Sequence, residues 1–217
     1  MGSTELLFEL PNDQEDTQAK GQTLVLEAPI SREASISAMS QMVTHQRSQD
    51  MLDLYQLSIC LIRCTSPDEV AATGLEMLRV RTQSTAVGFL WIDDQGELKP
   101  QLVVPPGLAD RFRLHKKLTQ RVSREGRAVW VKDRIAGTGQ EATFADAICV
   151  PLMSDTTVMG AIHLYREEGK FEKEHFDFAI SAGNMLAVAL ESSRAQASLS
   201  AEHQRLRRTA DFCRVDR

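Results

Sequence analysis

The sequence predicts an α+β fold, in which helices pack on a central antiparallel sheet and long helices lie at the N- and C-terminal ends. Three observations predict this class. Residues 147–165 alternate apolar side chains around a polar turn, as a hairpin does. Residues 171–212 contain no proline and only one glycine, Gly183, which favours a single long helix. The elements follow the order helix, helix, strand, strand, helix, strand, strand, long helix, which is typical of one sheet covered by helices.

The composition is that of an ordinary globular protein, with 217 residues, 42% of them hydrophobic and 25% charged. No apolar run approaches the roughly 20 residues that span a bilayer, and Glu5 and Glu9 lie where a signal peptide is basic. The four cysteines are too few for a disulfide framework and fit reduced thiols. We therefore expect a cytoplasmic protein without membrane contact.

Residues 1–35 contain seven acidic and two basic residues, and this excess equals the formal net charge of -5. This segment is expected to be an acidic flexible tail or linker. Within it, residues 5–10 are either the remnant of a strand from a preceding domain or part of a disordered terminus. The rest of the chain is neutral and offers no broad basic face, so direct contact with nucleic acid is not expected.

Two helices are predicted next. Residues 36–64 place apolar side chains at three- and four-residue spacings and form the N-terminal helix that leads into the domain. Ser66 is a suitable N-cap and Pro67 a suitable first-turn residue for a second helix that ends near Arg81. In this scheme, two helices precede any strand.

The sheet begins with a strand at residues 85–92, a turn that contains Gly96, and a second strand at 101–104. Residues 108–125 then form a helix that stops at Gly126, because glycine is typical just beyond a helix end.

A short extended piece at 128–131 and a loop at 133–146 follow this helix. The final hairpin has strands at 147–153 and 158–165, joined by a turn at 154–157.

Several stretches resemble a GAF domain, which has a PAS-like sheet. GRAVWVKD (126–133) and the run that begins AICVPLMSDTTVMGAIHLY (147–165) are similar to its second half. SPDEVAATGLEML (66–78) and AVGFLWID (86–93) are similar to its first half. The resemblance covers a sensory domain at residues 52–195. It leaves 196–217 as an exit helix and a junction toward a missing output module.

The resemblance implies a small-molecule sensor and dimerisation module that has no catalysis of its own. It also implies that any ligand lies between the sheet and the segment 105–146, which we call the lid. Cyclic-nucleotide-binding members carry an Asn-Lys pair near the last strand, whereas this chain lacks that pair and has His175 in place of an acid. Bilin-attaching members need a cysteine in the lid, which contains none. The ligand or cofactor therefore stays unidentified.

The candidate ligand-binding residues are aromatic, imidazole, thiol and cationic side chains on the strands and the lid. Aromatic rings either stack on a planar ligand or pack as plain core. His163 either points into the pocket with Tyr165 and Ala161 or faces solvent. The cationic lid helix either attracts an anionic metabolite or is a solvated face. The candidates are Phe89, Trp91, Arg111, His115, Trp130, Phe144, Cys149 and His163.

No metal site is predicted. Cys60 and Cys64 lie four residues apart on one helical face, but no His or Asp lies at partner spacing. They are either half of a metal or redox site or small residues of a buried stripe.

The terminal helices are predicted to form a homodimer. Their heptad positions are small and partly polar, which favours a weak coiled coil that a ligand-dependent change can repack. The candidate dimer residues are Ile36, Val43, Leu54, Met185, Leu199 and Leu206.

The function predicted from these features is a non-catalytic sensory and dimerisation domain of a signal-transduction or transcription regulator. Two alternatives remain open. One is a dimerisation spacer whose pocket is filled by Phe89, Trp91 and Phe144. The other is a thiol-dependent free methionine sulfoxide reductase, which needs Cys149 exposed in a cleft and a second thiol within reach.

Overall fold

The computed structural model describes residues 22–30, 45–92, 98–111, 122–133 and 146–215. Within these ranges the helices are α2 (His45–Arg63), α3 (Pro67–Arg81) and α5 (Lys173–Val215), together with the 3-10 helix η1 (Pro106–Arg111). The strands are β1 (Gln22–Pro29), β2 (Ala86–Ile92), β3 (Leu98–Val104), β4 (Arg127–Asp133), β5 (Asp146–Ser154) and β6 (Thr157–Arg166).

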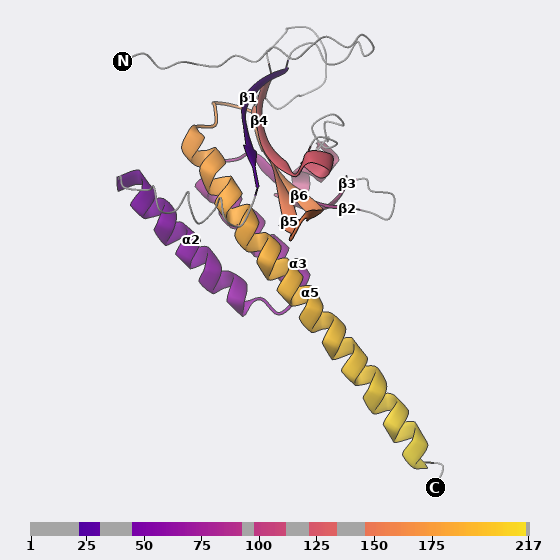
Figure 1. The fold of residues 1–217 in the computed structure, drawn as a ribbon. Helices are drawn as coiled ribbons and strands as arrows, with labels where there is room; N and C mark the ends of the chain where they lie inside the picture. The colour runs from indigo at the N-terminus through magenta and orange to yellow at the C-terminus, as the bar shows by residue number, and fades with distance from the viewer. Residues whose placement is uncertain (1–21, 31–44, 93–97, 112–121, 134–145, 216–217) are drawn as a thin grey trace, which may run out of the picture.

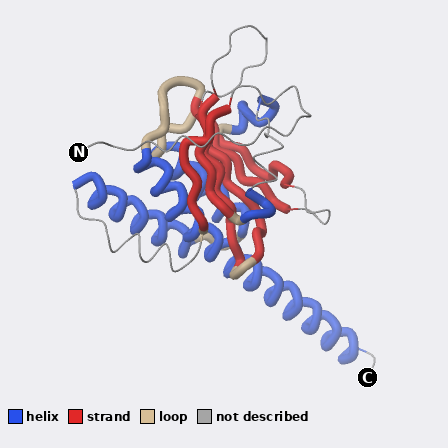
Figure 2. Tube along the Cα trace, turned by 45° about the horizontal axis from the view of Figure 1, so that its top comes forward, coloured by secondary structure: helices blue, strands red, loops and turns tan. Residues whose placement is uncertain are grey.

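The strands form one antiparallel sheet in the spatial order β1-β4-β5-β6-β2-β3. Helices α2, α3 and α5 cover one face of this sheet, which we call the helix face (Figure 1, Figure 2). The opposite face carries a second, smaller apolar cluster that the lid joins through Leu108 and Val122, and we call it the lid face. The prediction of an α+β fold is confirmed.

The hairpin β5–β6 forms the centre of the sheet. Its register pairs Ala147 with Tyr165 and Cys149 with His163. Asp155 in the turn has φ of 50°, a conformation that Asp tolerates better than most residues. Both strands are buried over most of their length, because helices cover one face and the second apolar cluster, with Leu108 and Val122, lies on the other. The prediction that residues 147–165 fold back as neighbouring antiparallel strands is confirmed.

Helix α3 begins as the sequence predicts. The Ser66 hydroxyl accepts a hydrogen bond from the backbone N–H of Glu69 at 3.2 Å, and Pro67 occupies the first turn. The helix packs closely on α5 at Gly74, where a Cβ atom would lie 2.1 Å from the side chain of Leu186. A larger residue at this position would therefore force the Leu186 side chain to move.

Helix α5 has two parts. Its first part buries Phe176, Ala182, Leu186 and Leu190 against the sheet and α3. Beyond Ser193, the described side chains are exposed, and the helix extends past the rest of the fold (Figure 1). The 43 residues of α5 span about 65 Å at 1.5 Å per residue.

Helix α2 is held by apolar packing and by two ion pairs with Arg81. Leu57 and Leu61 are buried in the main core. Arg81 at the end of α3 pairs with Asp50 and, with Nε 2.7 Å from Oδ2, with Asp53. These carboxylates are largely buried, so the entry helix is joined to α3 by a partly desolvated ion pair.

The structure corrects two predictions. Residues 22–29 lie in the segment predicted to be a flexible tail, but they form the edge strand β1, so a strand precedes the helices. The strand is held by backbone pairing with β4 and by an ion pair between Glu27 and Arg127 at 2.8 Å. The short extended piece inside the lid is likewise a full strand of the sheet, β4.

Among the described residues, no helix combines the length and apolarity that a membrane crossing requires.

Candidate functional site

The lid face of the sheet has a floor of small and apolar side chains. The described floor residues come from β2, β4, β5 and β6 and include Ala86, Leu90, Val129, Ala147, Cys149, Ala161 and Tyr165. His163 lies between Ala161 and Tyr165 on β6, and alternate residues of a strand share a face, so its side chain belongs to this floor. Of the two orientations that the sequence allows for His163, the structure shows the one beside Tyr165 and Ala161.

His163 occupies the middle of the floor. Its strand neighbours across the sheet are Cys149 on β5 and Gly88 on β2. The imidazole is fully buried, and its Nδ1 atom lies 3.2 Å from the hydroxyl oxygen of Tyr165. Either of these two groups can be the donor. The other ring nitrogen, Nε2, is buried and has no hydrogen-bond partner among the described residues.

A buried imidazole nitrogen without a partner is unusual, because most buried polar atoms in folded proteins are hydrogen-bonded. Burial lowers the pKa of His163 to about 3, so the ring is neutral at physiological pH. The site therefore presents one neutral hydrogen-bonding atom on an apolar floor.

Cys149 lies beside His163 but is not arranged as a nucleophile. Its thiol is completely buried, and burial raises its pKa, so the unreactive protonated form dominates. Cys60 on α2 and Cys64, directly after its last residue, lie on the opposite side of the sheet, and the side chain of Cys213 is not described. There the Cys64 thiol donates to the carbonyl oxygen of Cys60 at 3.3 Å. The described residues contain no group of His, Cys, Asp and Glu that could hold a metal ion.

The structure separates the predicted ligand-binding aromatic residues from His163. Phe89 and Trp91 make an edge-to-face contact with centroids 5.7 Å apart, and both lie on the helix face. Trp130 also lies on the helix face and stacks on Phe176 of α5. These three residues therefore face the side of the sheet opposite to Cys149 and His163, because successive residues of a strand point to opposite faces.

Three other predicted site residues cannot be placed. His115 and Phe144 lie outside the described residues, as does the side chain of Arg111.

Asp146 is a buried polar residue that the sequence analysis missed. It is the last residue of the lid segment. Its carboxylate accepts hydrogen bonds at 2.6 Å from the indole N–H of Trp130 and from the backbone N–H of Phe171. Burial raises its pKa, against the effect of these two bonds. Its position directly before an apolar strand is the only sequence signal, and that signal does not reveal either partner.

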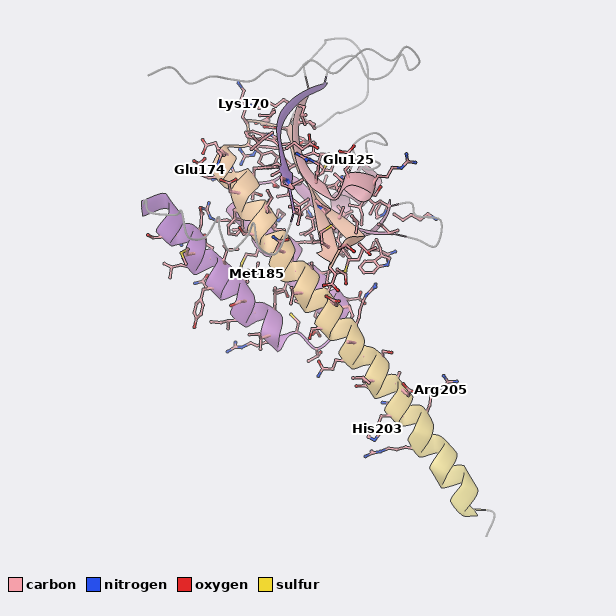
Figure 3. All side chains as sticks on the ribbon, in the orientation of Figure 1. Glu125, Lys170, Glu174, Met185, His203 and Arg205 are labelled. Atoms are coloured by element: carbon pink, nitrogen blue, oxygen red, sulfur yellow. The ribbon has the colours of Figure 1, made fainter. Side chains whose placement is uncertain are left out.

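The helix face carries a separate feature, a groove of about 900 Å³ between α2 and α5. Its walls include Leu54, Tyr55 and Ile62 from α2 and Met185 and Val188 from α5. Figure 3 shows Met185 on the stretch of α5 that runs beside α2. Ile62 is 82% exposed and Tyr55 is 65% exposed, so the α2 wall of the groove is itself an exposed apolar ridge. We call these features the α2–α5 groove and the α2 ridge.

The predicted dimer residues are distributed as follows. Leu54 and Met185 line the α2–α5 groove. Leu199 is 69% exposed on the projecting part of α5, where Figure 3 also labels His203 and Arg205. Ile36, Val43 and the side chain of Leu206 lie outside the described residues.

Comparison with known proteins gives one family and many similar structures. A family model described as a GAF domain matches residues 64–191. No curated protein matches the chain.

The similar solved structures include two GAF domains of phosphoenolpyruvate-protein phosphotransferases. The one from Coxiella burnetii has a TM-score of 0.59 and 14% identity, over 71% of this chain and 99% of that one. The one from Acinetobacter has a TM-score of 0.55 and 13% identity, over 70% and 97%. A free methionine-R-sulfoxide reductase from Neisseria meningitidis, in complex with its substrate, has a TM-score of 0.54 and 19% identity, over 71% and 96%. At these identities the likeness establishes the fold alone.

Proposed function

This chain belongs to the GAF domain family, and from that premise we propose that it is a non-catalytic sensory domain of a signalling protein. It binds a small molecule between the lid and the lid face of the sheet, and the terminal helices α2 and α5 pass the binding state on. The observation that carries this proposal is His163 on the lid face, whose buried Nε2 atom has no hydrogen-bond partner within the described part of the chain.

An unpartnered buried nitrogen costs free energy, about 1–3 kcal/mol when a buried polar group stays unsatisfied. A bound molecule that makes this hydrogen bond removes the cost. The ligand is thereby held by one hydrogen bond on an otherwise apolar floor. An apolar surface with a few polar groups is the usual composition of a small-molecule site. A spacer with a filled pocket has no use for such an atom, because a leucine or phenylalanine there would pack without the penalty.

The chemistry of the site favours binding over turnover. The reductase alternative needs a reactive thiolate and a second thiol within reach. The Cys149 thiol is fully buried and protonated, and the thiols of Cys60 and Cys64 lie across the sheet, at the C-terminal end of α2. We therefore expect no reduction of free methionine sulfoxide by the purified protein with a thiol reductant. Steady turnover would favour the reductase instead.

The proposal includes a homodimer formed through the helix face. The α2–α5 groove and the α2 ridge lie side by side on one surface. A two-fold axis brings the same patch of two copies together, so the ridge of each copy can enter the groove of the other. In this arrangement, the projecting part of α5 begins next to the dimer contact. A change in helix packing at that contact can therefore alter the direction in which this part of α5 extends.

Native mass spectrometry of the purified protein tests both parts of the proposal. The expected species is a dimer that carries one small molecule per chain, released on denaturation. If the measured mass equals that of the polypeptide alone, and no added mass is seen after incubation with the small-molecule fraction of a cell extract, the proposal that a ligand binds is contradicted. A monomer at micromolar concentration contradicts the dimer.

A further inference from the structure

A histidine closes the first turn of α5. The carbonyl oxygen of Glu172 accepts a hydrogen bond from the backbone N–H of Phe176 at 3.3 Å, so Glu172 is the N-cap of the helix and His175 is its third residue. The Nδ1 atom of His175 accepts a hydrogen bond from the backbone N–H of Glu172 at 3.0 Å. In a capping box, a glutamate or glutamine at this third position accepts the same bond. A titratable imidazole has that role here.

This cap requires the neutral form of His175. A ring nitrogen that accepts a hydrogen bond carries no proton, whereas both nitrogens of an imidazolium ion are donors. Protonation therefore removes the acceptor of the Glu172 N–H group. It also places a positive charge at the N-terminal end of a helix, where the helix dipole disfavours cations.

The surroundings of His175 oppose its protonation. The ring is partly buried. Two cations face it from other elements, Arg166 at the end of β6 and Arg81 at the end of α3, while Glu172 and Glu174 beside it act in the opposite direction. Burial, together with the charge of Arg166, lowers the pKa of His175 from its ordinary value of 6.5.

The capped turn adjoins the contact between the lid segment and α5. The ring of Phe171 meets His175 edge to face, with centroids 6.1 Å apart, and it also lies 4.8 Å from the guanidinium carbon of Arg166. A charged His175 would therefore repel Arg166 beside one aromatic ring. The backbone N–H of Phe171 is the group that donates to the buried carboxylate of Asp146.

From this geometry we infer that His175 makes the start of α5 a pH-sensitive joint. The neutral ring caps the helix and keeps Phe171 in place on Asp146. As the pH falls below 6.5, the open turn binds a proton more readily than the closed turn, so the turn opens more often and releases the Phe171–Asp146 bond. A proton is thus a second input to α5, in addition to the ligand of the proposed function.

NMR of the histidine-labelled whole chain provides the first test. The ring resonances of His175 are assigned by their loss in the variant His175→Gln and are then followed from neutral to acidic pH. Their titration midpoint is expected below 6.5, the ordinary value for histidine.

Hydrogen exchange provides the second test. Protection factors of the Phe171, Glu172 and Phe176 amides are measured at two pH values and corrected for the intrinsic exchange rate. Between about pH 7.5 and pH 5.5 they are expected to fall by up to about tenfold, the limit for an open state with a pKa of 6.5. The amide of Leu186, in the buried part of α5, should show no loss that depends on His175.

Two variants separate the imidazole from other effects of pH. The side-chain oxygen of His175→Gln can accept the cap bond but does not titrate in this range. The protection of its first turn should therefore match the wild type at the higher pH and show no His175-dependent fall at the lower one. His175→Ala has no acceptor, so protection should be low at both pH values. Both variants keep His163, whose titration then affects all three proteins equally.

The results distinguish this inference from the proposed function. An equal pH dependence in the wild type and in His175→Gln overturns the pH-sensitive joint, as does a His175 titration midpoint at or above 6.5. Neither result changes the expected binding of a small molecule on the lid face. Conversely, the expected pH response in a chain that retains no small molecule would support the joint while the proposed ligand fails.

Discussion

The carboxylate of Asp146 accepts a hydrogen bond from the backbone N–H of Phe171 at 2.6 Å. This bond joins the last residue of the lid to the chain two residues before α5 begins. The same carboxylate holds the indole of Trp130, which stacks on Phe176 in the first turn of α5. The lid and the exit helix therefore meet at one buried acid.

Replacement of this acid by its amide should weaken the joint. Asp146→Asn offers one acceptor to two N–H donors, so one donor is left buried and unpaired. We expect a loss of about 1–3 kcal/mol in the free energy of unfolding, measured by urea denaturation. Hydrogen exchange of the Phe171 amide should become faster.

The matched control is Asp177→Asn, because Asp177 forms an exposed pair with Lys173 at 2.8 Å. Its effect should stay within about 0.5 kcal/mol. Equal losses in the two variants would argue against a special role for Asp146.

His163 predicts a pH dependence. The folded pKa of about 3 lies below the ordinary value of 6.5, so below pH 6.5 the unfolded chain binds a proton that the folded protein does not. The contribution of His163 to the free energy of unfolding is largest above pH 6.5 and is lost as the pH falls toward 3. Between pH 6.5 and 5.5 the loss should be about 1 kcal/mol.

Urea denaturation at the two pH values measures this effect, and His163→Phe supplies the reference. The variant lacks the titrating group, so its stability should change less than that of the wild type by about 1 kcal/mol. Parallel behaviour of the two proteins would mean that His163 is protonated equally in both states.

Arg81 links α2 to α3, which gives a test of how the entry helix is attached. Arg81→Met leaves Asp50 and Asp53 close together and partly buried without their cation. We expect a loss of about 2–3 kcal/mol, below the 3–5 kcal/mol typical of fully buried pairs, and faster hydrogen exchange in α2.

Arg79→Met is the control on the same helix, because Arg79 pairs with Glu76 on the surface. It should cost less than about 1 kcal/mol. A larger effect for Arg79 than for Arg81 would contradict the proposed attachment of α2.

Gly160 tests the packing of the central strands. A Cβ atom at this position would lie 2.5 Å from the carbonyl oxygen of Leu90, and backbone cannot yield as a side chain does. Gly160→Ala should therefore destabilise the fold by about 1–3 kcal/mol. Gly107→Ala serves as the reference, since nothing lies within 4 Å of its added Cβ. Similar stability of the two variants, measured by thermal unfolding, would argue against this close approach.

The proposed dimer contact can be broken without harm to the core. Ile62 is 82% exposed in the single chain, so Ile62→Glu should fold normally yet place a charge in the partner's groove. We expect light scattering coupled to size exclusion to shift from dimer toward monomer. Val80→Glu, at a 62% exposed site on α3 outside the groove lining, should leave the dimer intact. If both variants stay dimeric, the α2–α5 groove is not the interface.

The predictability of the fold differed between elements for physical reasons. The hairpin β5–β6 was predictable because two alternating apolar runs flank a polar turn, so local sequence alone specifies it. Strand β1 was missed because its eight residues are followed by no turn partner. It is held instead by pairing with β4, about a hundred residues away, and such a distant pairing leaves no local pattern.

The candidate site was predictable only in part. Alternation within one strand offered a position of His163 beside Tyr165 and Ala161, but it left open whether the side chain faces the interior or solvent. It could not relate Phe89 to Cys149, because the face that each residue occupies depends on the register between β2, β6 and β5. The partners of Asp146 likewise come from two other elements.

The most direct test of the central claim is the ¹⁵N spectrum of His163 in histidine-labelled whole chain. It is recorded after removal of small molecules by unfolding and refolding, and again after addition of the small-molecule fraction of a cell extract. If a ligand binds at His163, the Nε2 resonance shifts on addition, while that of His203 on the exposed part of α5 does not. An Nε2 resonance that is identical in both samples would contradict the account and identify the lid face as closed core.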